Sequence, residues 1–329
     1  MNNINHSEIS DYLSALAADD APVIYCPNPG NGGDALIAAS TFQLFERSGL
    51  SYNAYHWSEV LSLELDWSKH VFVYGGGGAF VNEYQGAPRI LIEALHKRVK
   101  KLVILPHTIN THADVLSELG SNVEIICREQ TSFEYVRASA PKANVFLMED
   151  LGLSLDVEDV FKRGRSMLMP ILFGGVDGQM RSSNKSHTSS ANFVKKLLKV
   201  GAFEFLLGIK YLFRGKAKEV NCFRNDGEKT NIQGGANNYD ISELFMFGHS
   251  CQKTALYTTY RFMRFIDRYD VINTNRLHVA IGAALLGKRV KFYPNSYYKC
   301  QAVYDYSIKD NYANVEWCWP SGVIEKKGL

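Results

Sequence analysis

Four side chains suited to holding a compact anion each follow a predicted strand in the second half of the chain. They are Arg224, Arg276, His278 and Lys299. Guanidinium forks bind carboxylate and phosphate in a bidentate way, and the amides of a helix N-terminus add further donors. One such residue alone is more often part of a surface ion pair, but four at strand ends predict a shared pocket for a small polyanion.

A second candidate site follows the first predicted strand, in residues 26–34, CPNPGNGGD. Its glycines let the backbone approach a ligand, while Asn31 and Asp34 lie where the next helix begins. The glycines also match a loose dinucleotide fingerprint, but the second predicted strand does not end in the acidic residue that a ribose hydroxyl needs. We expect Asp34 to face a ligand, with a helix N-cap as the alternative.

Three more motifs end strands of the first half. A run of four glycines, which includes Gly76, Gly77 and Gly78, offers backbone N–H groups to anions or sugar hydroxyls, or else forms a tight turn. His107, in the sequence LPHT, is expected to contact either a ligand or the neighbouring loop backbone. Arg128, in the sequence CRE, either binds a ligand or ties a loop through an ion pair.

The elements that position these residues alternate between strands and helices. The strands predicted in the first half are Pro22–Cys26, Tyr52–His56, His70–Tyr74, Lys101–Pro106, Val123–Cys127 and Asn144–Met148. The helices predicted between them are Asp34–Arg47, Pro88–Val99, Thr111–Leu119 and Glu129–Ala138. This alternation is typical of βαβ units around a parallel sheet, where ligands bind at the carboxyl ends of the strands.

The second half repeats the alternation more loosely. Its predicted strands are Glu219–Phe223, Val271–Asn273 and Val290–Phe292. Its predicted helices are Ser242–Phe247, Thr254–Asp267, Arg276–Leu286 and Tyr297–Tyr306. We therefore predict an α/β protein with two Rossmann-like domains, residues 1–160 and 161–329, that face each other across a cleft.

A basic amphipathic insert, at about residues 179–218, fits neither half. Gln179–Ala191 is rich in polar residues and predicts a mobile loop, whereas Asn192–Lys216 predicts a helix. The basic residues of this helix fall within a sector of about 100°, and most of the remaining surface is apolar. They are Lys195, Lys196, Lys199, Lys210 and Arg214. Such a helix suits an anionic membrane surface, or else the core or a homo-oligomer interface.

Composition excludes several classes of protein. The 329 residues are 46% hydrophobic and 21% charged with a net charge of +2, which gives no sign of disorder or of nucleic-acid binding. Six scattered cysteines without a C-x-x-C pair predict buried reduced thiols rather than a metal site or a disulfide framework. The polar N-terminus and the lack of a run of about 20 apolar residues predict a cytoplasmic protein, free or resting on a membrane.

The order of these motifs resembles the polysaccharide pyruvyltransferase family over most of the chain. The motifs are N-G-G-D, G-G-G-G, L-P-H-T, C-R-E-x-x-S, F-R-N-D and N-R-L-H-x-x-I. The resemblance implies a fold similar to GT-B glycosyltransferases. The implied reaction forms a pyruvate ketal across two sugar hydroxyls, with phosphoenolpyruvate as co-substrate, phosphate as the leaving group and no further cofactor. Residues 165–218 depart from the family pattern, so the acceptor stays open.

By position, the resemblance assigns Arg224, Arg276, His278 and Lys299 to the phosphoenolpyruvate donor. It assigns the acceptor and catalytic side to Asn31, Asp34, Gly76, Gly77, Gly78, His107 and Arg128. Asp34 is expected to accept a proton from a sugar hydroxyl, and His278 to act as an acid toward the donor. No step needs a metal. Because this family acts on cell-surface polysaccharides, a lipid-linked oligosaccharide acceptor is expected, which favours the membrane role of the helix at 192–216.

Two other functions fit the same pattern. A nucleotide-sugar glycosyltransferase on a GT-B scaffold would need a pocket for a base and a ribose in the second half, where the cations suit a compact anion better. A non-catalytic protein that binds sugar phosphates or lipid headgroups would use the basic helix as its working part. A turnover assay distinguishes this binding protein from an enzyme.

Overall fold

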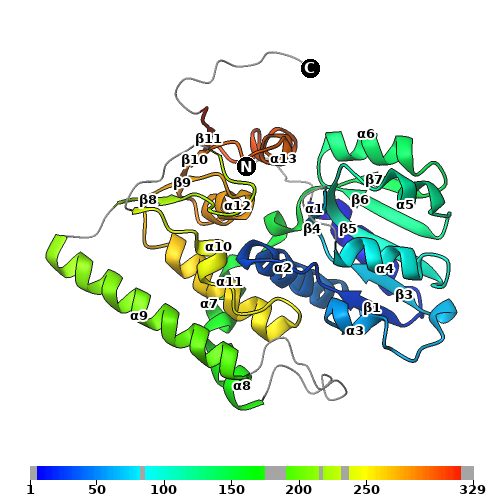
Figure 1. Ribbon diagram of the computed structural model, residues 1–329, viewed down its shortest axis with the longest axis horizontal. Coiled ribbons are helices and arrows are strands. Elements are labelled where there is room, and N and C mark those ends of the chain that lie inside the picture. The colour runs from blue at the N-terminus through cyan, green and yellow to red at the C-terminus, as the bar shows by residue number, and fades with distance from the viewer. Residues whose placement is uncertain (1–5, 82–85, 175–189, 215–217, 231–236, 320–329) are drawn as a thin grey trace.

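The computed structural model describes residues 6–81, 86–174, 190–214, 218–230 and 237–319, and it contains two β-sheets with helices packed against them (Figure 1). Every strand pair in both sheets is parallel. The chain is therefore an α/β protein, as the alternation of elements predicts. Its division into two domains stays a prediction.

The larger sheet has the strand order β2-β1-β3-β5-β6-β7, with β4 paired to β5. Its strands are β1 (Val23–Cys26), β2 (Tyr52–Ala54), β3 (Val71–Tyr74), β4 (Gly77–Phe80), β5 (Lys101–Ile109), β6 (Val123–Cys127) and β7 (Asn144–Leu147). The six predicted strands are confirmed. The strand order reverses between β1 and β3, which is where a parallel sheet opens a crevice for ligands.

The glycine run does not form a free loop after β3. Its last two residues begin β4, in which Gly77 lies opposite His107 of β5. Gly77 has φ 154°, a conformation that side chains rarely adopt, so the run is needed for the backbone to turn back against the sheet. The sequence did not predict this strand because four glycines carry no strand-forming side chains.

The helices beside the larger sheet are α1 (His6–Ala17), α2 (Gly32–Ser48), α3 (Trp57–Val60), α4 (Ala87–Leu95), α5 (Ala113–Glu118) and α6 (Gln130–Ser139), with a 3-10 turn at Trp67–Lys69. The longest, α2, begins after the N-cap Asn31 and ends at Gly49, whose left-handed φ of 69° suits a glycine C-cap. Its thirteen buried residues make α2 a core helix on almost every side.

The smaller sheet has the order β11-β10-β9-β8. Its strands are β8 (Glu219–Cys222), β9 (Val271–Thr274), β10 (Arg289–Phe292) and β11 (Val315–Trp317). Its helices are α10 (Ile241–Leu244), α11 (Gln252–Ile266), α12 (Leu277–Leu285) and α13 (Lys299–Val303), followed by a π-helical turn at Tyr304–Ile308. The three predicted strands are confirmed, while the short edge strand β11 was not predicted.

Two hydrophobic clusters hold the sheets and helices together. One lies on the face of the larger sheet that is covered by α4, α5 and α6. The other is shared by both sheets: it joins β1 and α2 to α11, α12, β9 and β10. Because α2 packs along α11, the two sheets are linked through this helix pair, which lies at the centre of Figure 1.

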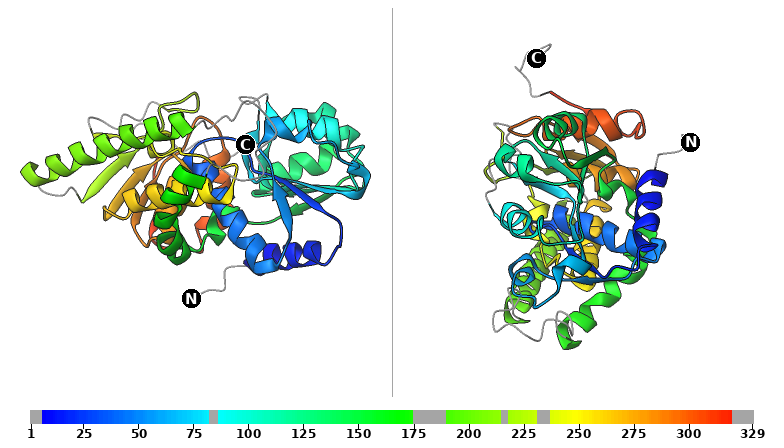
Figure 2. Two further views of the ribbon diagram at one scale, coloured as in Figure 1. Left: turned by 90° about the horizontal axis from the view of Figure 1, so that it is seen from below. Right: turned by 90° about the vertical axis from the view of Figure 1, so that its right-hand side faces the viewer.

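The described parts of the segment between the sheets are mostly helical. A 3-10 turn at Leu151–Ser154 leads to α7 (Val157–Gly164), a second 3-10 turn at Arg165–Met167, α8 (Leu168–Gly174) and α9 (Ser190–Arg214). The predicted helix at 192–216 is thereby confirmed with slightly earlier bounds, and all but the end of the loop predicted at 179–191 lies outside the described residues. Figure 2 shows α9 extending along an outer edge of the molecule.

The cysteines agree with the expectation of buried reduced thiols, except that Cys318 is only partly covered. Five cysteines are buried, Cys318 is half-buried, and all six are free thiols. None of the described helices is both long enough and apolar enough to cross a bilayer. Within the described ranges, no group of three or more His, Cys, Asp or Glu side chains is placed to hold a metal ion.

Candidate active site

A cavity of about 390 Å³ is lined by segments that follow strands of both sheets. The predicted site residues that line it are Asn31, Asp34, Gly78, Arg128, Arg224, Arg276, His278 and Lys299. Residues far apart in the sequence therefore meet at one place, because the carboxyl ends of the strands of both sheets face the cavity. The predicted convergence of the four donor residues is confirmed as geometry, and their ligand roles stay predictions.

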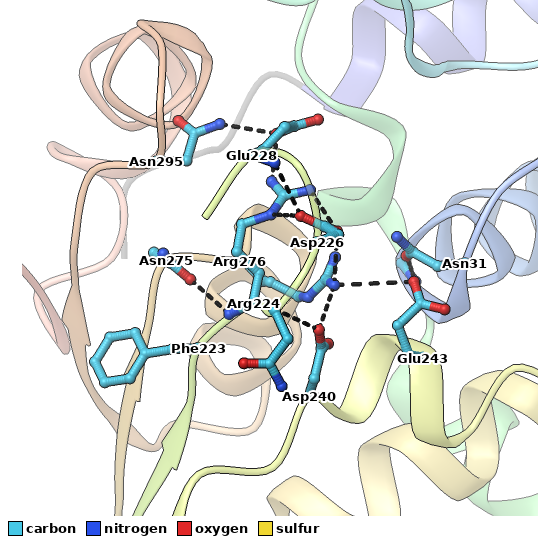
Figure 3. A network of polar contacts seen from close by, with 12 residues as sticks. Asn31, Phe223, Arg224, Asp226, Glu228, Asp240, Glu243, Asn275, Arg276 and Asn295 are labelled. Atoms are coloured by element: carbon cyan, nitrogen blue, oxygen red, sulfur yellow. Dashed lines mark hydrogen bonds and ion pairs between the residues drawn. The ribbon is translucent and has the colours of Figure 1, made fainter. Parts of the chain in front are cut away.

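The guanidinium group of Arg224 is held by the loop that follows β8. Its Nε and Nη2 donate to the two carboxylate oxygens of Asp226 at 2.7 and 2.9 Å, and its Nη1 donates to Glu228 (Figure 3). Burial raises the pKa of Asp226, but the hydrogen bond from Arg224 and the charge of Arg276 outweigh it and lower the pKa to about 2. Asp226 is therefore an anion at neutral pH, and it fixes the plane of the fork.

Arg276 is the N-cap residue of α12 and shares the same acidic loop. Its Nη2 donates to Asp226 at 2.9 Å and to Asp240 at 2.6 Å (Figure 3). Its Nε is buried and has no hydrogen-bond partner among the described residues. A buried donor without an acceptor is costly, so this edge of the guanidinium group is suited to a ligand oxygen.

Lys299 is the first residue of α13 and the last of the four predicted donor residues along the chain. Its Nζ lies 2.9 and 3.2 Å from the two oxygens of Glu228, and 4.9 Å from the centre of the Tyr297 ring. Glu228 is only 2% exposed and also accepts a hydrogen bond from Asn295. One buried carboxylate thus ties two cations, Arg224 and Lys299, into a single cluster.

The walls of the cavity are balanced in charge. The basic members are Arg128, Arg224, Arg276 and Lys299, and the acidic members are Asp34, Asp226, Glu228 and Glu243. A free polyanion would therefore meet cations that already have carboxylate partners. The acidic residues hold the cations in place, and a ligand must compete with them for the same N–H groups.

Asp34 lies at the start of α2 and completes a capping box. The side chain of Asn31 accepts a hydrogen bond from the Gly33 amide, and Asp34 Oδ2 accepts one from the Asn31 amide at 2.9 Å. Asp34 Oδ1 accepts a further bond from Asn28 at 2.9 Å. The alternative of a capping role is thus partly correct, although Asn31 is the N-cap. Each carboxylate oxygen has a second lone pair, so capping leaves Asp34 able to accept a proton.

Arg128 joins the end of β6 to the turn after β7 through a buried ion pair. Its Nη1 lies 2.7 Å from Asp150, both side chains are 1% exposed, and its Nε donates to Thr108. The His278 Nε2 lies 3.6 Å from the same oxygen of Asp150, an ion-pair distance when the ring is protonated. Asp150 is thus the shared neighbour of Arg128 and His278.

Two glycines bring the backbone up against these side chains. A Cβ on Gly78 would lie 2.8 Å from Arg128 Nη2, and a Cβ on Gly33 would lie 2.7 Å from His278 Nδ1. Real Cβ atoms do not approach other atoms so closely, so a side chain at either glycine would displace its neighbour, Arg128 or His278. The two glycines therefore leave room for one side chain predicted to bind the acceptor and one predicted to act on the donor.

Three residues predicted to contact the acceptor do not line the cavity. Gly76 and Gly77 are buried, and His107 is fully buried beside them. Burial and the charge of Arg128 lower the pKa of His107 to about 3, so its ring is neutral and its Nε2 accepts a hydrogen bond from the Ala79 amide at 3.0 Å. His107 thus contacts backbone, as its alternative predicted, but that backbone belongs to strand β4 and not to a loop.

Four acidic residues of the site were not predicted from the sequence. They are Asp150, Asp226, Glu228 and Asp240. Asp150 follows β7 at the same edge of the sheet as Arg128, and Asp226 lies in the sequence FRND, so the strand-end argument applied to both. Asp240 precedes a short helix far from any strand end, and only the fold brings it to Arg276.

The chain is similar to a protein family and to a solved structure. A family model described as polysaccharide pyruvyl transferase matches residues 31–297, which include every predicted cavity residue except Lys299. The crystal structure of an uncharacterized protein from Klebsiella pneumoniae subsp. pneumoniae is similar over 98% of this chain and 100% of that chain, with 26% sequence identity and a TM-score of 0.71. No curated protein matches the sequence.

Proposed function

Because this chain belongs to the polysaccharide pyruvyl transferase family, we propose that it moves pyruvate from phosphoenolpyruvate to two hydroxyls of one sugar, forming a pyruvate ketal and releasing phosphate. The observation that carries this proposal is the cavity itself, where three cations and His278 meet at strand ends. Phosphoenolpyruvate places a carboxylate and a phosphate close together, and fixed guanidinium groups suit both. The unpaired Nε of Arg276 supports a ligand oxygen at this point.

The proposed chemistry needs only the two substrates. His278 gives a proton to the methylene carbon of the donor, which leaves an oxocarbenium-like centre at the adjacent carbon. The first sugar hydroxyl adds to that carbon and loses its proton to Asp34. The second hydroxyl then forms the other C–O bond as the phosphate ester bond to carbon breaks, and its proton leaves with phosphate. Asp34 then releases its proton to solvent and His278 takes one up, so donor and diol give ketal and phosphate in balance, without a cofactor.

The acceptor is proposed from the family and from the cavity walls. We assign it to a sugar of a cell-surface polysaccharide or of its lipid-linked precursor, bound on the side of Asn31, Asp34 and Arg128. The enzyme would then act in the cytoplasm at the inner face of the membrane. Two parallel sheets that both line the cavity support the GT-B-like division into residues 1–160 and 161–329.

The direct test is phosphate release from phosphoenolpyruvate, with and without lipid-linked oligosaccharide extracted from the source cell. Release that depends on the acceptor, with pyruvate recovered in the glycan by mass spectrometry, would support the proposal. Tight binding of a nucleotide sugar without any such release would instead favour a glycosyltransferase. Binding of sugar phosphates without turnover of any donor would favour a non-enzymatic role.

Replacing His278 with alanine should lower kcat by about 10²- to 10⁴-fold, the usual contribution of a positioned proton donor. Binding of phosphoenolpyruvate should change much less, since Arg224, Arg276 and Lys299 remain. Rapid-quench turnover at saturating donor, together with calorimetric titration of the donor, separates the two effects. Near-normal turnover of H278A would show that another group supplies the proton.

Replacing Gly33 with alanine should lower kcat by about 10- to 100-fold, because the new methyl group displaces the His278 ring. Thermal stability should not fall by a similar degree, since alanine favours the first turn of α2 more than glycine does. Gly86→Ala is the matched control, because a Cβ at Gly86 would have no atom within 4 Å. Equal activity of the two variants would contradict the tight fit between α2 and His278.

A further inference from the structure

The outward side of α9 carries exposed apolar side chains along nearly its whole length. We call this set the α9 apolar face: Val194, Leu198, Phe205, Leu206, Leu212 and Phe213. Leu212 and Phe213 are 84% and 85% exposed, which is far from the usual state of large apolar residues. A helix of 25 residues is about 37 Å long, so these side chains form an extended apolar strip rather than one isolated contact.

The opposite side of α9 is packed into the protein. Phe193, Val200 and Leu207 are buried, and the ring of Phe193 lies 5.7 Å from that of Phe247. Phe203 packs in the same way against Tyr239 at 5.4 Å. The α9 apolar face is therefore presented by a helix that the fold holds in position.

Charge is distributed unevenly around α9. Lys195 and Lys199 are exposed, and at about 100° per residue they lie along one border of the apolar face. The only acidic residue of the helix, Glu204, lies on the inward side, where Arg261 and Arg268 bind it at 2.7 and 3.1 Å. Among the described side chains of α9, the outward side thus carries positive charge and no negative charge.

We propose that α9 docks this protein on an anionic lipid surface, with the α9 apolar face in the boundary between headgroups and acyl chains. Lys195 and Lys199 then lie beside the lipid phosphates. A lipid surface fits better than a second copy of the chain, since the cores of protein interfaces are depleted in lysine while interfacial helices are enriched in it. The helix lies on the bilayer and does not span it.

The docking helix is connected to the cavity. Lys196 Nζ donates to the backbone carbonyl of Glu243 at 2.7 Å, and Glu243 lines the cavity beside Arg276. Docking through α9 therefore holds the cavity close to the bilayer, where a lipid-linked sugar is presented. Only this link to the acceptor rests on the proposed function, because attachment of the protein to lipid does not depend on which reaction it catalyses.

Co-sedimentation with vesicles tests the docking without any turnover. The full chain should bind to phosphatidylcholine vesicles that contain phosphatidylglycerol. It should bind much less to vesicles of phosphatidylcholine alone. Lys195→Glu with Lys199→Glu should weaken binding by about 10-fold or more, because each lysine near an anionic surface contributes measurably. Leu198→Ser with Phe205→Ser and Leu212→Ser should reduce it at least as much. Lys196 is left unchanged because it contacts the cavity wall.

Matched controls remove similar groups elsewhere on the surface. Lys142→Glu reverses an exposed lysine between α6 and β7, and Ile90→Ser removes a 46% exposed apolar side chain from α4. Both should bind vesicles like the native chain. Lack of native binding to anionic vesicles would overturn the proposal, as would equal losses in controls and α9 variants.

A second copy of the chain is the remaining competitor for this surface. Sedimentation velocity of the native chain and of the triple serine variant gives the answer. A native dimer that the serine substitutions convert to a monomer, without vesicle binding by either, would assign the α9 apolar face to self-association and overturn the lipid proposal. A native monomer that binds anionic vesicles supports it. Because neither measurement uses phosphoenolpyruvate, both results hold whether or not the proposed reaction is correct.

Discussion

Replacing Arg276 with alanine should lower kcat/KM for phosphoenolpyruvate by about 10²- to 10³-fold, a loss of about 2.7–4 kcal/mol of transition-state stabilisation. The side chain lies in the cavity wall with a buried, unpaired Nε, while Asp226 and Asp240 hold its Nη2. Arg276→Lys should recover only part of this loss, since an ammonium group keeps the charge but not the planar fork. Steady-state phosphate release at varied donor concentration measures both variants.

A control separates ligand binding from a structural role of Arg276. Its removal leaves Asp226 and Asp240 without one cation, so thermal unfolding of each variant must accompany the kinetics. Arg98→Ala removes an exposed arginine and should leave both kcat/KM and the thermal unfolding temperature unchanged. Partial rescue of R276A by added ethylguanidine would identify the missing group as a ligand contact. Full activity in R276A would remove Arg276 from the donor site.

Replacing Asp150 with alanine should lower the free energy of unfolding by about 3–5 kcal/mol, because it leaves the guanidinium group of Arg128 buried without its counter-ion. The matched control is Glu118→Ala, which breaks the exposed pair of Lys97 and Glu118 and should destabilise the fold far less, because solvent screens exposed ion pairs. Urea unfolding monitored by circular dichroism measures the free energy of unfolding of both variants. Similar losses for both substitutions would show that burial does not increase the contribution of the Arg128–Asp150 pair to stability.

The same pair predicts how stability depends on pH. Burial raises the pKa of Asp150, but the charge of Arg128 and the contact with His278 outweigh it and hold that pKa well below its usual range. A carboxyl with a depressed folded pKa stabilises the fold above its unfolded pKa of about 3.9. This contribution is lost as the pH falls through the folded value. The acid unfolding curve of Asp150→Asn should therefore be flatter below about pH 4 than that of the native chain.

A paired substitution separates stability from activity at this position. Arg128→Met with Asp150→Leu removes both charges together, and a well-packed apolar pair of this kind often restores stability. Activity should stay low, because Arg128 lines the cavity and His278 loses its anionic neighbour. Recovery of activity along with stability would show that the pair serves the fold alone.

Much of the fold was predictable because its signals are local. The strand at Val123–Cys127 is a short aliphatic run, and its bounds match the prediction. The rule that ligands bind at the carboxyl ends of parallel strands also predicted which residues meet in the cavity, since Arg224, Arg276 and Lys299 each follow a strand of the smaller sheet. By contrast, β4 depends on backbone pairing of glycines with β5, which no side-chain pattern reports.

The carboxylates that pair with the cations of the site were less predictable than the cations themselves. Asp240 and Arg276 are separated by 36 residues, and their contact depends on where α10 packs. The orientation of α9 was equally hidden: its pattern shows an apolar helix with basic residues, but not which side the protein covers. The ion pairs of Glu204 with Arg261 of α11 and with Arg268, two residues after that helix, settle that question in the structure.

The balanced charge of the cavity has a consequence for the end of the catalytic cycle. In the proposed reaction, when the phosphate group separates from carbon, Asp226, Glu228 and Asp240 are already beside the cations that would hold it. These carboxylates replace the departing anion at once, so the empty site is not left with unpaired buried charge. Inorganic phosphate should therefore be a weak product inhibitor of the proposed reaction, even at millimolar concentration.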